Sequence, residues 1–314
     1  MAAETRTLIL PRATSLVRDC STEVVGIRMH EALDSCGQGA SRCREYESCG
    51  RRSCDRLPRF RTSMEEWQRR QVDEWHRRGY LPKLGDLAKS FAAPFWWYDR
   101  TRPIGSSIKH NGTMVFVDTG TKIVGVTADH VYRGYLRDVA ENPNLICQIG
   151  AFTFQPETRL IDADHTLDLA TFELSEIFVV GSRSNVFRRS AWPASPLIEG
   201  ELALLGGFPG AMRSERPAAC DFDFSWFVTR ADSSSPRHAS IVLNLAEAHG
   251  PGSTRLPLGT DLGGASGGPV FRLNDGAITP LELVGFIYEY GPGMELVFAS
   301  HASSVGSDGT LHRL

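Results

Sequence analysis

The chain lacks the features that mark membrane, fibrous and nucleic-acid-binding proteins. It holds only four lysines, and its formal net charge at pH 7 is −3. No stretch approaches the ~18 consecutive apolar residues of a membrane-spanning helix. Thirty glycines and seventeen prolines in 314 residues favour a turn-rich protein over a helical bundle. A membrane span, a coiled coil, a collagen-like chain and a general nucleic-acid binder, which usually has a strongly basic domain, are therefore excluded.

The sequence also lacks the patterns of common cofactor sites. The glycine-rich run 259–264 contains no lysine and is not followed by a helical pattern, which argues against a phosphate-binding loop. Beyond residue 90, no His, Cys, Asp or Glu residues have the spacing of metal ligands. We therefore expect neither a metal nor an organic cofactor.

Charge and cysteine are distributed unevenly along the chain. Residues 1–63 carry eleven Arg and no Lys against eight acidic residues, whereas residues 91–314 have a net charge of −7. This basic head shows no sustained helical or strand period, so we expect a poorly ordered arm with free thiols. A zinc site, disulfides and a natural start at Met64 stay open as alternatives. Five of the seven cysteines lie in the head: Cys20, Cys36, Cys43, Cys49 and Cys54.

Residues 64–79 have the pattern of a helix. Trp67, Val72 and Trp75 supply a thin apolar stripe, and Arg77-Arg78-Gly79 suit a C-terminal end. We expect an accessory helical segment over residues 64–90.

Residues 91–314 contain short β-branched runs separated by Gly- and Pro-rich turns. This pattern is typical of antiparallel sheets rather than of βαβ units. Runs 113–117 and 122–127 flank turn residues and predict a hairpin. Asn111-Gly112 is a second turn signal. We expect both cysteines of this body, Cys147 and Cys220, to be buried small apolar residues.

Three local features of the body carry side chains suited to acyl transfer. Ser266 stands in a glycine-rich run, where tight turns expose backbone N–H groups that can stabilise an oxyanion. His130 follows an apolar run. Asp168 stands in an alternating run, where an unpaired carboxylate is costly to bury. Each feature alone is more often structural, but together they have the order His…Asp…Ser.

That order is the chain order of the chymotrypsin-like serine proteases. Over residues 95–303 the sequence resembles the trypsin-like serine peptidases, especially the bacterial single-chain type. The resemblance rests on three motifs, Thr127-Ala128-x-His130, Asp168-Leu169-Ala170 and Gly264-x-Ser266-Gly267-Gly268-Pro269, with weaker support from residues 207–210 and 285–286.

The resemblance implies an all-β fold of two antiparallel six-stranded barrels, preceded by the N-terminal helix. The protease domain would span residues 91–314. Its first barrel would cover about residues 95–182 and its second about 198–303, joined by the polar stretch near 181–200.

The resemblance also implies a serine endopeptidase. Ser266 would be the nucleophile, His130 the general base and then acid, and Asp168 the group that orients the imidazole. The N–H groups of Gly264 and Ser266 would form the oxyanion hole. Asp129, beside His130, is a rival carboxylate, but adjacent side chains on a strand point to opposite faces.

One departure from the family pattern concerns activation. Many secreted members carry Asp directly before the nucleophile, where it pairs with a new amino terminus, but this chain has Ala265. We therefore expect activity without zymogen cleavage.

The substrate preference stays open. Asp261 or Glu289 could favour a basic residue before the cut, the neighbouring tyrosines could favour small side chains, or both carboxylates could face solvent. The resemblance assigns the substrate-binding surface to Thr260, Asp261, Tyr288, Glu289 and Tyr290.

Two other functions stay open: a catalytically silent binding module with a protease fold, and an esterase that uses the same nucleophile. The expected partner is a polypeptide substrate, with no nucleic acid and no membrane, and the sequence predicts no oligomeric state. Because no signal peptide or membrane segment is visible, the cytoplasm is the expected compartment.

Overall fold

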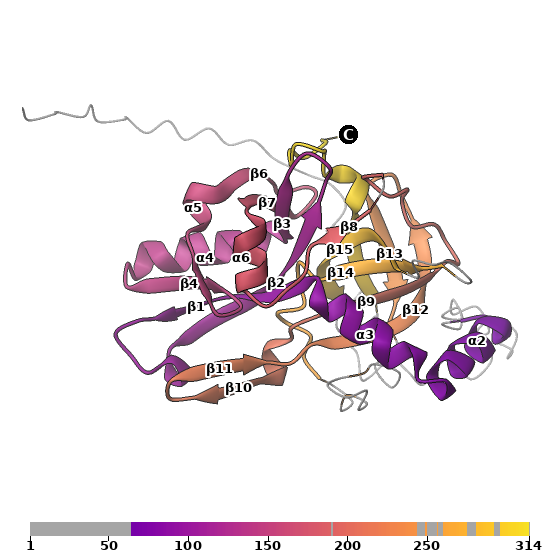
Figure 1. Cartoon of the computed structure of the whole chain (residues 1–314), viewed down its shortest axis with the longest axis horizontal. Coiled ribbons are helices and arrows are strands. Elements are labelled where there is room, and N and C mark those ends of the chain that lie inside the picture. The colour runs from indigo at the N-terminus through magenta and orange to yellow at the C-terminus, as the bar shows by residue number, and fades with distance from the viewer. Residues whose placement is uncertain are drawn as a thin grey trace, which may run out of the picture. The chain divides into compact units, whose positions relative to one another are not determined.

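A computed structural model describes residues 64–189, 191–243, 249, 256, 260–274, 281–291 and 296–313 (Figure 1). The chain divides into two units, Met1–Phe60 and Arg61–Leu314, and every described residue belongs to the second. The predictions for the cysteine-rich head, including its order, zinc and disulfides, therefore lie outside the described residues.

Two helices open the described chain. The first, α2 (Glu66–Arg77), lies within the segment expected to be helical. The second, α3 (Tyr80–Ser90), begins after Gly79, whose φ of +68° suits a residue without a side chain. Sequence analysis did not anticipate α3 as a separate helix. It packs closely on the barrel, because a Cβ at Gly85 would lie 2.3 Å from the indole nitrogen of Trp226.

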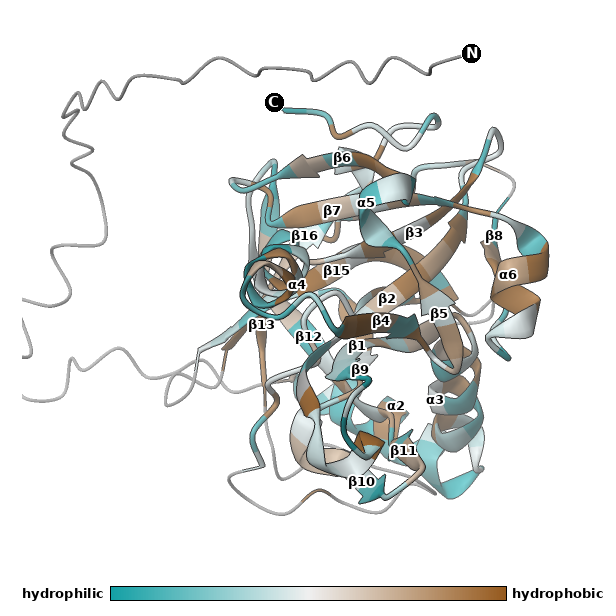
Figure 2. Ribbon diagram, turned by 90° about the vertical axis from the view of Figure 1, so that its left-hand side faces the viewer, coloured by the Kyte–Doolittle hydropathy of each residue, from teal (hydrophilic) through white to brown (hydrophobic). Residues whose placement is uncertain are grey.

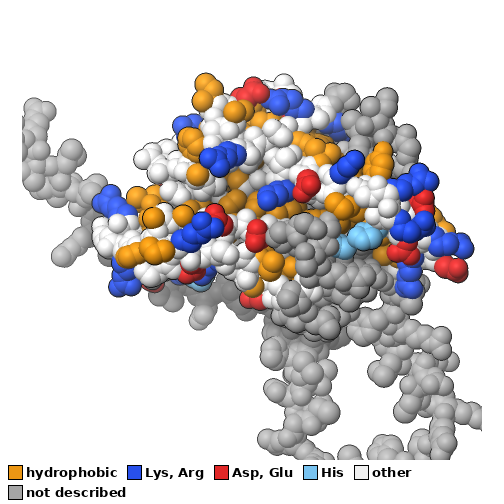
Figure 3. All heavy atoms as spheres, turned by 60° about the horizontal axis from the view of Figure 1, so that its bottom comes forward, with side chains coloured by type: hydrophobic (Ala, Val, Ile, Leu, Met, Phe, Trp, Pro, Cys, Tyr) orange, Lys and Arg blue, Asp and Glu red, His pale blue; other side chains and the backbone are white. Residues whose placement is uncertain are grey.

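The surface of α2 carries charges of both signs. Arg70 lies 3.5 Å from Glu66, and Arg78 lies 2.5 Å from Glu74. At the right of Figure 3, basic and acidic side chains lie next to one another on the surface. Because the charges are mixed, the helix presents no patch of one sign that would attract a polyanion.

The first half of the body is a curled sheet of eight strands. Its order is β5-β4-β1-β2-β3-β7-β6, and β8 pairs in parallel with β2. The strands are β1 (Ala92–Asp99), β2 (Ile108–Asp118), β3 (Ile123–Thr127), β4 (Leu145–Ile149), β5 (Phe152–Phe154), β6 (Leu160–Asp164), β7 (Leu169–Leu174) and β8 (Phe187–Arg188).

The expected hairpin is present, because β2 and β3 pair antiparallel. The prediction of a turn at Asn111-Gly112 is wrong, since both residues lie inside β2. The glycine serves packing instead. A Cβ at Gly112 would lie 2.5 Å from a methyl group of Val131.

The second half of the body is a closed barrel in the order β12-β13-β16-β15-β14-β9. A separate hairpin, β10–β11, lies below β1 of the first half in Figure 1, where Phe222 packs on Trp96. These strands are β9 (Leu202–Gly207), β10 (Arg213–Arg216), β11 (Ala219–Phe222), β12 (Ser225–Ser234), β13 (His238–Val242), β14 (Pro269–Leu273), β15 (Leu281–Gly291) and β16 (Leu296–His301).

The all-β class and the six-stranded second barrel are confirmed. The first half differs in detail from the expected barrel: it has eight strands, and among the described residues its strand path stays open.

The prediction for the two cysteines of the body is half correct. Cys147 is buried in the first sheet, whereas Cys220 on the β10–β11 hairpin is only partly buried.

The remaining helices are short apart from α4. That helix begins directly after β3, and its side chains Val131, Tyr132 and Tyr135 pack into the core of the first sheet. No helix among the described residues is long and apolar enough to cross a membrane. The bounds are α4 (Asp129–Glu141), α5 (Pro156–Arg159) and α6 (Glu176–Gly181), with 3-10 turns at Ile104–Ser106, Gly210–Met212 and Ala302–Ser304.

The central strands are buried on both faces. On β2, Val115 and Val117 join the core between the two halves, while Met114 and Phe116 join the core of the first sheet. Figure 2 shows the resulting concentration of hydrophobic residues in β2, β3 and β4. Because side chains of a strand alternate between faces, one face of β2 packs on the second half of the body and the other on the first sheet.

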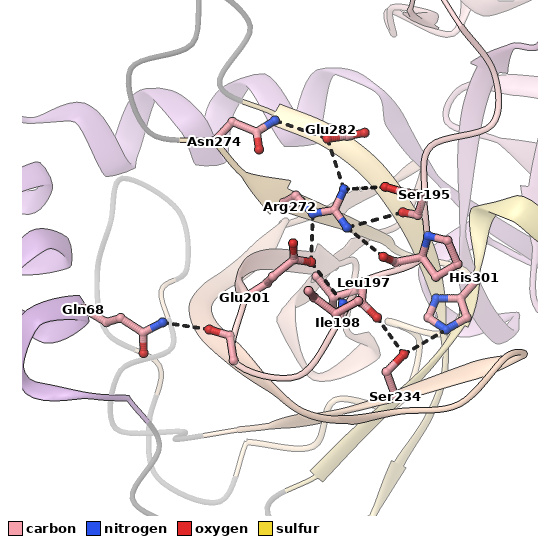
Figure 4. A network of polar contacts seen from close by, with 12 residues as sticks. Gln68, Ser195, Leu197, Ile198, Glu201, Ser234, Arg272, Asn274, Glu282 and His301 are labelled. Atoms are coloured by element: carbon pink, nitrogen blue, oxygen red, sulfur yellow. Dashed lines mark hydrogen bonds and ion pairs between the residues drawn. The ribbon is translucent and has the colours of Figure 1, made fainter.

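A buried arginine holds the segment that joins the two halves (Figure 4). Arg272 on β14 donates to Glu201 at 2.8 Å and to the Pro196 carbonyl at 2.7 Å. It also lies 3.2 Å from Glu282 on β15. The side chains of Arg272 and Glu282 are only 11% and 10% exposed, and each has a second partner, because Arg272 pairs with Glu201 and Glu282 with Arg189.

His301, beside this network, is expected to make the fold sensitive to acid. It is buried, and its Nε2 donates to the Ser235 carbonyl at 3.0 Å. Burial, reinforced by the charge of Arg272, lowers the pKa of His301 although two backbone hydrogen bonds oppose the shift. A lowered histidine pKa contributes stability that is complete above about pH 6.5 and is lost as the pH falls through the folded-state value.

The thermal unfolding midpoint of the wild type should therefore fall as the pH drops below about 6.5, and that of His301→Gln should fall less. His238, whose pKa burial also lowers, should keep part of the dependence in the variant. Equal pH slopes for the two proteins would contradict this assignment.

Candidate active site

The ends of β3 and β7 bring His130 and Asp168 together. The two strands pair antiparallel, and their last pair joins Thr127 to Ala170. His130 follows in the first turn of α4, and Asp168 directly precedes β7. Asp168 Oδ2 lies 2.6 Å from His130 Nδ1, and Oδ1 accepts the backbone N–H of His130 at 2.8 Å. The carboxylate therefore fixes both the ring and the backbone of the histidine, and leaves Nε2 to exchange a proton.

The backbone of Asp168 adopts an uncommon conformation. Its φ is +48°, in the left-handed region that few non-glycine residues occupy. Sequence analysis placed Asp168 inside a strand, but β7 starts at Leu169 and the aspartate lies in the preceding turn. The Asp168 side chain is 18% exposed and that of His130 is 48% exposed. Backbone strain of this kind persists where surrounding contacts enforce it, and it clusters at functional sites.

Asp129, the rival carboxylate, forms its own ion pair. It is buried, lies 2.6 Å from Arg133 one turn along α4, and lies 3.7 Å from His165. Burial raises the pKa of Asp129, while the charge of Arg133 lowers it. The alternation of a strand does not apply to Asp129, because the residue begins a helix. The two carboxylates differ in their partners instead: Asp129 pairs with Arg133, and Asp168 contacts His130.

The loop that carries Ser266 lies against the same strand ends. The Ser266 carbonyl accepts the N–H of Thr113 on β2 at 2.8 Å. A Cβ at Gly267 would lie 2.0 Å from the Thr113 carbonyl oxygen and 2.9 Å from Thr127 Cα. Because Thr127 ends the strand that leads to His130, the loop lies beside the histidine–aspartate pair.

The Ser266 hydroxyl lies 3.5 Å from the Tyr288 carbonyl oxygen, a long contact. Burial raises the pKa of Tyr288, and the charges of Glu289 and Asp168 raise it further. Among the described residues, no hydrogen bond joins Ser266 to His130. Catalytic hydrogen bonds are often long before substrate binds.

The two backbone groups assigned to the oxyanion hole have no partner among the described residues. The neighbouring N–H groups of Ala265, Gly267 and Gly268 all donate, to the carbonyls of Leu262, Ile287 and Ala265 respectively. The N–H groups of Gly264 and Ser266 do not. Gly264 has φ +101°, a conformation that glycine allows. The loop can therefore offer two N–H groups to an anionic oxygen.

The predicted substrate-binding residues lie on two segments that flank the loop. Thr260 and Asp261 precede it, and Asp261 accepts the N–H of Gly263 at 2.8 Å. Residues 288–290 lie on β15, which is joined to the loop by the hydrogen bond from the Ile287 N–H to the Gly268 carbonyl. Asp261 and Glu289 are both exposed.

Two contributors to the site were missed from the sequence. Thr113 looked like an ordinary strand residue, yet it is fully buried against the Ser266 loop. The segment 207–210 also packs on this loop, since the Gly210 N–H donates to the Gly263 carbonyl at 2.7 Å. Sequence analysis used this segment only as weaker support for the resemblance and did not place it at the site. The described residues hold no group of three or more side chains arranged to bind a metal ion.

Comparisons with known proteins leave the family open. No protein-family model matches the chain, and no curated protein matches it. Among solved structures, the chain is similar to the thermostable serine protease AL20 from an extremophilic microorganism, with 13% identity and a TM-score of 0.37. That match covers 68% of this chain and 92% of the other. Because the similarity is low, the function proposed below rests on the site itself.

Proposed function

We propose that the protein is a serine endopeptidase that uses His130, Asp168 and Ser266. The observation that carries the proposal is the double contact of the Asp168 carboxylate with His130, at 2.6 and 2.8 Å. It lies beside a glycine-rich loop that presents a serine. A carboxylate that holds both the ring and the backbone of a histidine is suited to fix its tautomer.

In the proposed reaction, Ser266 Oγ attacks the carbonyl carbon of the peptide bond and His130 Nε2 takes the hydroxyl proton. Asp168 stabilises the imidazolium that forms. The N–H groups of Gly264 and Ser266 bind the oxyanion, and Nε2 then protonates the leaving amine. Water then takes the place of the amine: it attacks the acyl carbon while Nε2 takes its proton, and that proton passes to Ser266 Oγ as the carboxylic acid product leaves.

The enzyme is proposed to be active without zymogen cleavage. The residue before Ser266 is Ala265, which is buried and has no group to pair with a new amino terminus. Backbone hydrogen bonds to the loop, such as the one from Gly210 to Gly263, support a loop that is already formed.

The polypeptide substrate is proposed to bind along residues 288–290 of β15, with Thr260 and Asp261 near the side chain that precedes the cut. The exposure of Asp261 and Glu289 gives no support to a buried acidic pocket for Arg or Lys. Cleavage of a peptide library would show the preference directly. A strong requirement for a basic residue would restore the acidic-pocket hypothesis.

The function is tested by incubating the purified full chain with a denatured protein substrate and identifying the products by mass spectrometry. We expect internal cleavage by the wild type and none by Ser266→Ala, which controls for contaminating proteases. Hydrolysis of activated esters but not of peptides would indicate the esterase alternative. No hydrolysis of either substrate would indicate a silent binding module.

A further inference from the structure

We propose that Thr113 is a positioning residue that holds the oxyanion loop in its active conformation. The inference rests on the function proposed above. Ala265 offers no side-chain bond to fix the loop, so its conformation must be set by other groups. Thr113 belongs to the other half of the body and is 0% exposed.

Every polar group of Thr113 is used at this junction. Its N–H donates to the Ser266 carbonyl at 2.8 Å, and its Oγ1 donates to the Gly264 carbonyl at 2.9 Å. The same Oγ1 accepts the N–H of Phe208 at 3.0 Å. Its own carbonyl accepts Thr127 Oγ1 at 2.6 Å. One residue thus binds the loop on both sides of Ala265.

These bonds act on the peptide groups that carry the oxyanion donors. The Ser266 N–H belongs to the peptide between residues 265 and 266, and Thr113 fixes the carbonyls of Gly264 and Ser266 on either side of it. Thr113 therefore fixes the two neighbouring peptide groups, and the peptide between them is held by its own Ala265 carbonyl, which accepts the Gly268 N–H at 2.8 Å.

The second donor is held indirectly. The Gly264 N–H shares a peptide group with the Gly263 carbonyl, which accepts the Gly210 N–H at 2.7 Å. The segment that contains Gly210 is anchored at Phe208 by Thr113 Oγ1. Thus the one hydroxyl supports both donors.

Asn111 strengthens the same anchor. It lies two residues before Thr113 on β2, so both side chains point to one face of the strand. Its Nδ2 donates to the Phe208 carbonyl at 2.7 Å. Phe208 is therefore held through both its N–H and its carbonyl. Because oxyanion donors act only when they are preorganised, loosening this anchor should slow the chemical step more than it weakens substrate binding.

The test replaces Thr113 by valine, which keeps the shape and removes the hydroxyl. The rate of Ser266 modification by a fluorophosphonate probe, and kcat on a peptide cleaved by the wild type, should each fall by about 10- to 100-fold, with KM nearly unchanged. Thr113→Ser restores the hydroxyl and should recover most of the rate. Unfolding midpoints are measured alongside.

The matched control is Thr229→Val. Thr229 is also buried, and its hydroxyl donates to the Val242 carbonyl at 2.7 Å within the barrel. We expect this variant to keep the wild-type labelling rate. If Thr113→Val does not fold, Asn111→Ala loosens the same Phe208 anchor and should also slow labelling.

The possible failures are distinguishable. A folded Thr113→Val with the wild-type labelling rate and kcat would overturn the inference and leave the proposed function intact. If only Asn111→Ala can be measured, an unchanged rate would have the same meaning. A folded wild type that neither reacts with the probe nor cleaves peptide would instead overturn the proposed function.

Discussion

Asp168→Asn is expected to lower kcat by about 10⁴-fold while leaving KM and the fold nearly unchanged. Asp168 accepts from the backbone N–H of His130 with Oδ1 and faces Nδ1 with Oδ2. An asparagine that keeps the first bond presents its NH₂ group to Nδ1. That arrangement places the ring proton on Nε2, which then cannot take the proton of Ser266. Steady-state kinetics on the peptide substrate measure the change.

Asp129→Asn is the matched control for this experiment. It removes a carboxylate from the residue next to His130, and that carboxylate pairs with Arg133 instead of the imidazole. We expect a small loss of stability, because the ion pair is lost while Arg133 stays exposed to water, and a kcat close to that of the wild type. If Asp129→Asn lost activity as severely as Asp168→Asn, the assignment of Asp168 would be wrong.

Gly267→Ala is expected to destabilise the protein by about 3 kcal/mol or more and to abolish labelling of Ser266. The residue has φ +86°, and a Cβ there would lie 2.0 Å from the Thr113 carbonyl and 2.5 Å from Thr127 Oγ1. The nearest of these atoms is backbone within a paired strand, so the clash cannot be relieved by a rotamer change. The loop would have to move away from β2.

Gly120→Ala separates the clash from the backbone strain. Gly120 also has φ +86°, but nothing lies within 4 Å of the added Cβ. It should therefore lose only the ~1–2 kcal/mol of a left-handed residue with a side chain and keep full activity. Chemical denaturation of both variants measures the difference. Equal losses of stability in the two variants would contradict the close packing of Gly267 on β2.

Much of the site could be predicted because its residues lie in short local motifs. Apolar β-branched runs predicted β2 and β3. The motif that contains His130 comes directly after β3 in the chain. The fold of the first half was harder to predict. Strand β1 (Ala92–Asp99) contributes side chains to the core while pairing with both β2 and β4, so it shows no alternation of polar and apolar residues. The start of α4 at Asp129 was also missed.

Thr113 could not be recognised from the sequence for a different reason. A threonine in a β-branched run is ordinary, and its partners Phe208, Gly264 and Ser266 are about 95 to 153 residues away in the chain. Only the packing of the two halves brings them together. For the same reason, the ion pair of Asp129 became clear only when the residue was found on a helix.

The central claim is that Ser266 is a nucleophile activated by His130 and Asp168. The most direct measurement is reaction of the full chain with a fluorophosphonate probe, followed by mass spectrometry of the modified peptide. We predict one adduct, on Ser266, that is absent from Ser266→Ala and strongly reduced in Asp168→Asn. A folded protein with no adduct, or with an adduct on another residue while Ser266→Ala still cleaves peptide, would contradict the account.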